Sequence, residues 1–224
     1  PSYAGQILTF PYPLIGNYGV PDTGGEMLPA FVESERIHPT AIIVADYSEA
    51  YSHWNAKESL AAWLKREKVP GITGVDTRRL TQVLREHGVM MGRITESGEE
   101  TDKSPILGGK LGEALVARVS CKEINRYNEG AGKRVVLVDC GVKANIIRCL
   151  IKRGVEVIRV PWDYDFNRLD FDGLFLANGP GDPAHCEKTV EHIRTFLNGK
   201  TVRPCMGICL GNQLLARAAG ARTY

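Results

Sequence analysis

The sequence predicts an α/β protein with an N-terminal mixed α/β domain followed by an open, mostly parallel, doubly wound sheet. From residue 133 onward, short and nearly continuous apolar runs alternate with helical patterns, as in strands buried on both faces of a parallel sheet. The first 118 residues instead mix strand-like runs, turns and two helical patterns. Asn and Gly are concentrated in residues 125–132, as in linkers. We therefore predict domains at residues 1–124 and 133–224, joined by a linker at 125–132.

Within the N-terminal domain, the apolar spacing predicts two strands and two helices. The strand-like runs are residues 6–10 and 40–46. Apolar side chains recur on one face of residues 59–68 and again on one face of residues 77–87. These elements are consistent with a separate mixed α/β domain.

The C-terminal domain shows the alternation that is typical of a doubly wound sheet. Apolar runs predict strands at residues 135–138, 155–160, 173–177 and 203–206. Helices are predicted at 143–153 and 185–197, each followed closely by a glycine that ends it. In such sheets the functional residues lie on loops at the carboxyl ends of the strands.

Composition and charge exclude several classes of function. The 224 residues carry 28 Lys and Arg against 26 Asp and Glu, without the long blocks of one sign that nucleic-acid binding favours. No apolar run approaches the ~20 residues that span a bilayer, and no signal-peptide pattern opens the sequence. We expect a cytoplasmic protein that binds neither membrane nor nucleic acid. Because the sequence begins at Pro1 without Met, we also expect it to be a fragment.

The cysteines and histidines do not form a metal-binding or disulfide pattern. The six cysteines include no C-x-x-C pair, and the five histidines include no H-x-x-x-H or H-E-x-x-H cluster. We expect no metal site and no disulfide framework, and we expect most of the thiols to be buried.

A G-x-C-x-G sequence lies between the last predicted strand and a helix. It comprises Gly207, Cys209 and Gly211, and it has the pattern of a nucleophile elbow. The glycines are needed because the turn is sharp and a Cβ at either position would collide with neighbouring backbone. Cys209 would then stand at a helix N-terminus, which favours the thiolate. Accidental close packing of Gly beside Cys is the alternative explanation.

A second glycine-rich loop follows the strand predicted at residues 173–177. Its sequence, Asn178-Gly-Pro-Gly-Asp-Pro183, holds the backbone stiff and lets it approach a ligand closely. A cysteine that attacks an amide requires backbone donors for the oxyanion. We predict that these donors are the N–H groups of Gly179 and Leu210. A plain strand-to-helix turn is the alternative.

Two sequences resemble nucleotide-binding motifs but lack the required context. Residues 179–184 fit G-x-G-x-x-A, yet they follow the third strand of the domain, and no acidic residue ends the next strand to bind a ribose. Residues 199–201 resemble the end of a phosphate loop, but Arg194 stands where that motif requires Gly. We therefore expect no cofactor in this chain.

Together the two glycine loops resemble those of the class I (triad) glutamine amidotransferases. Further stretches resemble the small subunit of carbamoyl phosphate synthetase, so that the resemblance covers nearly the whole chain. These stretches are Pro1-Ser-Tyr-Ala-Gly-Gln6, Tyr12-Pro-Leu-Ile-Gly-Asn17, Gly74-Val-Asp-Thr-Arg78 and Asp139-Cys-Gly-Val-Lys-Ala-Asn145.

The resemblance implies that Cys209 attacks the side-chain amide of L-glutamine and releases ammonia. A large synthetase subunit would combine that ammonia with bicarbonate and ATP, so that ATP and Mg²⁺ are expected in the partner. Because Ser2 is predicted to lie in the N-terminal domain, the pocket is expected at the domain interface. By the same resemblance, the residues that contact glutamine are Ser2, Gly179, Gly181, Leu210 and Gln213.

The sequence departs from the family pattern in two respects. Asn212 stands where the family often has His. The family's His-Pro-Glu sequence, which supplies the general base and its orienting carboxylate, is expected beyond Tyr224, and the family also has a strand-rich segment before the position of Pro1. We therefore expect the sequence to be truncated at both ends. Two alternatives remain: the glutaminase part of another synthase, which leaves the first 118 residues without a role, or a non-catalytic regulatory subunit, against which Cys209 argues.

Overall fold

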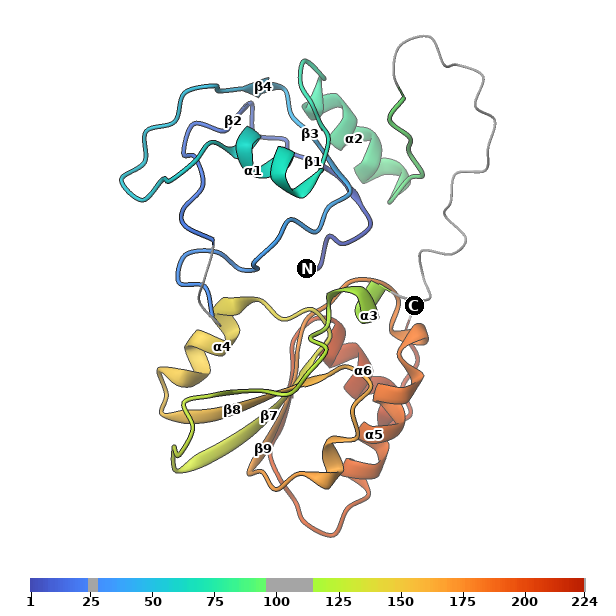
Figure 1. The fold of residues 1–224 in the computed structure, drawn as a ribbon. Helices are drawn as coiled ribbons and strands as arrows, with labels where there is room; N and C mark the ends of the chain where they lie inside the picture. The colour runs from blue at the N-terminus through green and yellow to red at the C-terminus, as the bar shows by residue number, and fades with distance from the viewer. Residues whose placement is uncertain (24–27, 96–114, 224) are drawn as a thin grey trace. The chain divides into compact units, whose positions relative to one another are not determined.

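The computed structural model in Figure 1 describes residues 1–23, 28–95 and 115–223. The chain forms two compact units, and each is described by itself. The N-terminal unit comprises Gly5–Gly25 and Glu35–Leu111. The C-terminal unit comprises Pro1–Ala4, Glu26–Ser34 and Gly112–Tyr224.

Short parallel strands form the sheets of the N-terminal unit. One sheet has the order β1-β3-β5, with β1 at Ile7–Thr9, β3 at Ala41–Ile43 and β5 at Gly71–Ile72. A second pairs β2 (Leu14–Ile15) with β4 (Asp46–Tyr47). The run predicted as one strand at residues 40–46 thus contributes β3 to one sheet and the start of β4 to the other.

The two helices of the N-terminal unit lie where the apolar spacing predicts them. Helix α1 spans Leu60–Glu67, and the hydroxyl of Ser59 caps it by accepting from the Ala62 N–H. Helix α2 spans Thr77–His87, and the Asp76 carboxylate caps it in the same way. Ile42, Val44 and Leu64 form the buried core of this unit.

A five-stranded sheet forms the centre of the C-terminal unit. Its order is β10-β9-β7-β8-β6, and all neighbours are parallel except β6 and β8. The strands are β6 (Asn125–Tyr127), β7 (Lys133–Asp139), β8 (Val155–Pro161), β9 (Gly173–Leu176) and β10 (Cys205–Gly207). The predicted mostly parallel sheet is confirmed. The stretch predicted as a linker begins with an edge strand, because Tyr127 pairs with Val157 and is buried.

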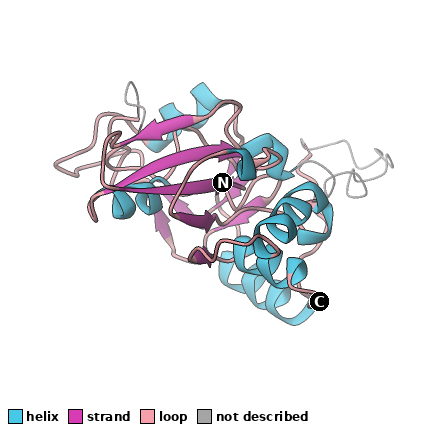
Figure 2. Cartoon of the chain, turned by 90° about the horizontal axis from the view of Figure 1, so that it is seen from below, coloured by secondary structure: helices cyan, strands magenta, loops and turns pink. Residues whose placement is uncertain are grey.

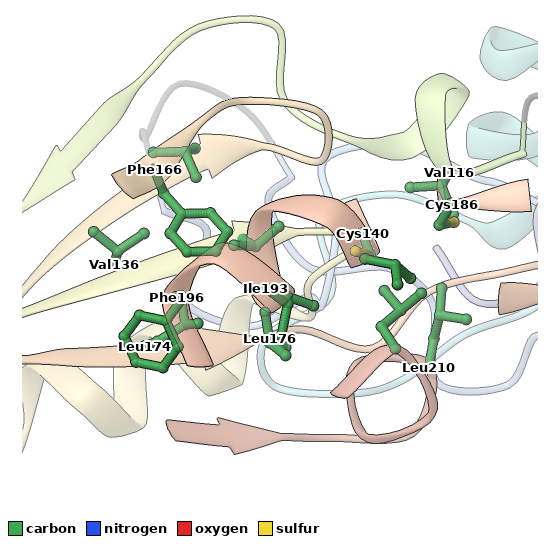
Figure 3. Close-up of a cluster of buried hydrophobic side chains, with 14 of the residues drawn as sticks. Val116, Val136, Cys140, Phe166, Leu174, Leu176, Cys186, Ile193, Phe196 and Leu210 are labelled. Atoms are coloured by element: carbon green, nitrogen blue, oxygen red, sulfur yellow. The ribbon is translucent and has the colours of Figure 1, made fainter. Parts of the chain in front are cut away.

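Helices cover both faces of this sheet (Figures 1 and 2). They are α3 (Leu115–Val119), α4 (Ala144–Ile151), α5 (Glu187–Leu197) and α6 (Leu210–Ala218). Val136 and Val138 of β7 pack into the cluster that contains α5 and α6 residues, shown in Figure 3, whereas Leu137 packs into the cluster that contains α4 residues. Successive side chains of the strand thus face opposite cores.

The helix predicted to begin at residue 185 starts two residues later, after a short 3-10 turn. Pro183–His185 forms a 3-10 turn, and α5 follows from Glu187. The cause is local, since the Asp182 carboxylate accepts a hydrogen bond from the Ala184 N–H at 2.8 Å and caps this short turn.

Two early segments pack with the C-terminal unit, unlike the predicted domain boundary. Arg148 of α4 forms an ion pair with Glu33, and the second carboxylate oxygen of Glu33 accepts from the Asn145 N–H. Ser2 accepts a hydrogen bond from Asn178. These contacts join residues more than 100 positions apart, so a composition shift along the chain could not reveal them. Among the described residues, no helix is long and apolar enough to cross a membrane.

We predict that truncating a β7 side chain destabilises the C-terminal unit. Val136 is 0% exposed and Val202 is 98% exposed, so Val136→Ala and Val202→Ala remove the same groups from opposite environments. Val136→Ala should lower the free energy of unfolding by about 2 kcal/mol, from lost burial plus the cavity left behind. Val202→Ala should change it by less than about 0.5 kcal/mol. Urea unfolding of both variants measures the difference, and equal losses would contradict the assigned packing.

Candidate active site

The strand order creates a topological switch point at the carboxyl ends of β7 and β9 in the C-terminal sheet. The chain passes from β7 to β8 on one side of β7, whereas β9 lies on the other side. The loops that follow β7 and β9 therefore diverge at a topological switch point, where open α/β sheets bind ligands. The loop after β7 begins at Cys140, the loop after β9 contains Gly179, and Cys209 follows the adjacent strand β10.

Cys209 occupies the strained turn that joins β10 to α6. Its φ is 53° and its ψ is −114°, a combination that non-glycine residues rarely adopt and that costs on the order of 1–3 kcal/mol. Two backbone hydrogen bonds hold the turn. The Ile208 N–H donates to the Leu176 carbonyl at 3.0 Å, and the Gly211 N–H donates to the Ile208 carbonyl at 2.9 Å. The Cys209 side chain is exposed. The predicted context of the elbow, a sharp turn at Cys209 between a strand and a helix, is confirmed.

The two glycines of the elbow are sterically required. A Cβ on Gly207 would lie 2.6 Å from the Asn212 nitrogen, and one on Gly211 would lie 2.1 Å from the Leu176 carbonyl oxygen. Both obstacles are backbone atoms, which cannot rotate away. The glycines therefore allow α6 to begin directly against the end of β9, as the G-x-C-x-G spacing predicts.

Gly179 packs between the loop after β7 and the start of α6. A Cβ at Gly179 would lie 2.1 Å from the Cys140 carbonyl oxygen and 2.8 Å from Cδ2 of Leu210. Leu210 is 1% exposed and lies with Cys140 in the buried cluster of Figure 3. This close packing brings the two residues predicted as oxyanion donors against each other.

The backbone N–H groups of Gly179 and Leu210 have the chemistry that an oxyanion requires. In the part of the chain that the structure describes, neither N–H donates a hydrogen bond to another group. Leu210 is the first residue of α6, where the helix dipole adds positive charge. Their action as an oxyanion hole stays a prediction.

Ser2 joins the same set of loops through a buried amide. Asn178 is 4% exposed, and its Nδ2 donates to the Ser2 hydroxyl oxygen at 3.0 Å and to the Gly141 carbonyl at 2.9 Å. Ser2 thus packs with the C-terminal unit itself, although the sequence predicted it in the N-terminal domain. No signal in the linear sequence marks Asn178 as the residue that holds Ser2.

Asp139, at the end of β7, holds the loop that contains Gly141. Its side chain is 0% exposed and forms an ion pair with Arg159 at 2.6 Å. The same carboxylate accepts hydrogen bonds of 2.8 Å from the N–H groups of Gly141, Val142 and Cys121. Burial alone disfavours the charge of Arg159, but the Asp139 carboxylate raises its pKa above the ordinary value. Sequence reasoning missed this pair, although Arg159 stands out as a charge within an apolar strand.

The remaining predicted contacts lie nearby along the chain. Gln213 is exposed on α6, and its N–H donates to the Cys209 carbonyl at 3.1 Å, one helical turn on. Gly181 is exposed with a φ of +84°, in the loop after β9. Their contact with glutamine stays a prediction. Within residues 1–23, 28–95 and 115–223, no three His, Cys, Asp or Glu side chains cluster to hold a metal ion.

The other thiols differ from Cys209 in their environment. Burial, with a contribution from Asp139, raises the pKa of Cys121 to about 12. Burial raises the pKa of Cys205 to about 11, and that of Cys186 to about 11 with a contribution from Asp182. Cys140 is 0% exposed, and its pKa is raised well above the ordinary value by burial. Of the six cysteines, Cys209 is the only one with an exposed side chain.

The elbow and the fold define a class of protein. Residues 136–224 match the family model described as "Glutamine amidotransferase class-I", which places this part of the chain in that class. Residues 1–94 match the model described as "Carbamoyl-phosphate synthase small chain, CPSase domain". The chain is therefore similar to carbamoyl-phosphate synthase small chains in its first part and to class I glutamine amidotransferases in its second part.

Individual relatives align with the whole chain. The arginine-specific small chain of carbamoyl phosphate synthase from Saccharomyces cerevisiae is 49% identical over 236 residues. The human mitochondrial carbamoyl-phosphate synthase named for ammonia is 44% identical over 227 residues, and the multifunctional protein ura1 of Schizosaccharomyces pombe is 43% identical over 254 residues. The alignments cover 56%, 15% and 11% of these relatives, so the chain spans only part of their length.

We predict that Gly211→Ala disrupts the elbow, whereas Gly132→Ala does not. The added Cβ would overlap the Leu176 carbonyl at position 211, but it would meet nothing within 4 Å at position 132. Gly211→Ala should lower the free energy of unfolding by about 3 kcal/mol and slow alkylation of Cys209. Gly132→Ala should stay within about 0.5 kcal/mol of the unmodified protein. Urea unfolding and iodoacetamide kinetics test both effects, and wild-type behaviour of Gly211→Ala would refute the close approach.

We also predict that iodoacetamide at neutral pH labels Cys209 first. Its thiol is exposed at a helix N-terminus, whereas the raised pKa values of Cys121, Cys186 and Cys205 keep those thiols protonated at this pH. Because thiolates form only as the pH approaches the pKa, raising the pH to 9 should not make these three reactive. Peptide mass spectrometry reports the order of labelling, with urea-unfolded protein as the reference. Predominant labelling of Cys121 or Cys186 would contradict the assignment.

Proposed function

We propose that the protein is the glutamine-hydrolysing subunit of a carbamoyl phosphate synthetase, with Cys209 as the nucleophile. The observation that carries this proposal is the exposed Cys209 thiol in a strained elbow, next to a glycine loop with backbone donors. An amide is a poor electrophile, so its attack requires both a reactive thiolate and stabilisation of the oxyanion.

In the proposed reaction, the Cys209 sulfur forms a bond to the side-chain amide carbon of glutamine. The negative charge that develops on the amide oxygen is stabilised by the N–H groups of Gly179 and Leu210. Collapse of this intermediate breaks the C–N bond, and the nitrogen leaves as ammonia once it is protonated. Water then hydrolyses the glutamyl thioester and regenerates the thiol. A general acid and base must transfer the protons in both steps.

We propose that Ser2, Gly181 and Gln213 complete the glutamine site. Gln213 lies one turn after Cys209 on α6, Gly181 follows the donor loop, and Ser2 is held by Asn178 beside that loop. Each can offer a hydrogen bond to the amino and carboxylate groups of glutamine. Binding that end of the substrate would hold the side-chain amide carbon in position for attack by the Cys209 sulfur.

We further propose that the ammonia is used by a large synthetase subunit. That partner would combine it with bicarbonate and ATP, with Mg²⁺ bound in the partner, and would make carbamoyl phosphate for arginine and pyrimidine biosynthesis. The yeast relative named as a small chain supports a separate partner, and the much longer human and fission-yeast relatives support a fused one. A cytoplasmic location stays a prediction, since the human relative is named mitochondrial.

A non-catalytic regulatory subunit is the second candidate. The human relative is named for ammonia, so similarity to these proteins does not by itself establish glutamine as the nitrogen source. The distinguishing feature in this chain is Cys209 between Gly207 and Gly211, with the strained backbone that the nucleophile requires. A scaffold would have no need of this strain.

We predict that Cys209→Ser removes glutamine-dependent synthesis and leaves ammonia-dependent synthesis intact. A serine hydroxyl at this position is a far weaker nucleophile, and the loss should be about 1000-fold or more. The matched control is Cys149→Ser, which changes a half-buried thiol on α4 and should keep both activities. The measurement is carbamoyl phosphate formation by the complete gene product with its synthetase partner, from glutamine and from ammonium. Equal loss from both nitrogen sources would show that Cys209 has a structural role only.

A further inference from the structure

Asn178 is a buried amide whose hydrogen bonds are fixed by its neighbours. Its side chain is 4% exposed, and its Nδ2 donates both to the Gly141 carbonyl and to the Ser2 hydroxyl oxygen. Because a carbonyl can only accept, the atom that faces Gly141 must be the NH₂ group. Among the described residues, the Asn178 Oδ1 has no hydrogen-bond partner. The orientation of this amide is thus set by the Gly141 backbone.

This orientation decides which way the Ser2 hydroxyl acts. A hydroxyl has one donor hydrogen and two acceptor lone pairs. The Ser2 oxygen already accepts from Asn178 at 3.0 Å, so its own hydrogen points elsewhere. Ser2 is therefore prepared to donate a hydrogen bond, and the groups of glutamine that can receive one are its carboxylate and its amide oxygen.

A rigid support lies behind Asn178. The Gly141 N–H donates to the Asp139 carboxylate at 2.8 Å, and that carboxylate is 0% exposed and paired with Arg159. The Gly141 carbonyl, from the same residue, receives the hydrogen bond of Asn178 at 2.9 Å. The carbonyl that orients Asn178 therefore belongs to a residue whose own N–H is bound to a buried charge, and such hydrogen bonds are costly to break.

We propose that Asn178 is a positioning residue for glutamine binding: it fixes Ser2 as a hydrogen-bond donor to the substrate. The proposal rests on the proposed function, in which Ser2 contacts glutamine. Asn178 itself need not touch the substrate, because its effect passes through the Ser2 hydroxyl. Its contribution should therefore disappear when that hydroxyl is removed.

A double-mutant cycle tests this dependence. Asn178→Ala, Ser2→Ala and the double variant are made in the complete gene product, and iodoacetamide alkylation of Cys209 is followed at increasing glutamine concentrations. The glutamine concentration that halves the alkylation rate measures binding without requiring turnover. When Ser2 is present, Asn178→Ala should raise this glutamine concentration roughly 10-fold or more, as expected for a lost hydrogen bond to a charged group. When Ser2 has been replaced by Ala, Asn178→Ala should raise the glutamine concentration less than about 3-fold.

Two further variants separate positioning from a general loss of structure. Asn167→Ala removes a half-buried amide that donates to the His192 carbonyl and does not contact the glycine loops, so it should leave glutamine protection unchanged. Asn178→Asp keeps the shape but turns the donor into an acceptor, which draws the Ser2 hydrogen away from the substrate and also opposes the Gly141 carbonyl. It should weaken glutamine protection at least as much as Asn178→Ala. Ser2→Ala leaves the contact between Asn178 and Gly141 in place and keeps the test available if neither Asn178 variant folds, because unchanged protection in Ser2→Ala alone would overturn the proposal.

The outcomes distinguish the two proposals. Equal factors for Asn178→Ala in both backgrounds would show that Asn178 acts by loosening the loop, and would overturn its positioning role. Unchanged protection in Asn178→Asp would overturn it as well. Failure of glutamine to protect Cys209 even in the unmodified protein would instead refute the proposed function.

Discussion

The buried ion pair between Asp139 and Arg159 is the interaction on which the rest of the site depends. Asp139 lies at the end of β7, at the switch point of the sheet, and its carboxylate binds the N–H groups of both Gly141 and Val142. A carboxylate with no exposure is stable only when its charge and lone pairs are matched. The matching groups are the guanidinium of Arg159 and the backbone of the next loop, so satisfying the charge also fixes the loop.

The loop that Asp139 holds contacts the other residues of the candidate site directly. The Cys140 carbonyl lies so close to Gly179 that a side chain could not fit, and Leu210 closes the other side. The Gly141 carbonyl orients Asn178, which in turn binds Ser2. Backbone atoms make most of these contacts, so the two glycine loops have little freedom to move. The strain at Cys209 is sustained because the surrounding packing leaves no room for the turn to relax.

Much of this architecture followed from the sequence because local rules govern it. The helix at Thr77–His87, the parallel strands after residue 133 and the elbow around Cys209 each depend on spacing within a few residues. The sequence did not predict the late start of α5 or the strand at Asn125–Tyr127, because each depends on a hydrogen bond that the local pattern does not show. A side-chain cap at Asp182 and the pairing with β8 overrode the local pattern.

The sequence by itself determined the parallel sheet, the two glycine loops and the sharp turn at Cys209. These features require particular residues at fixed separations, such as a glycine on either side of Cys209. Only the tertiary structure decided that Ser2 packs beside Asn178 and that Arg159 balances Asp139. A hydrogen bond between positions 2 and 178, or an ion pair across two strands, depends on how the chain folds back on itself. No spacing rule reports such contacts, because their energy comes from burial that exists only once the sheet has formed.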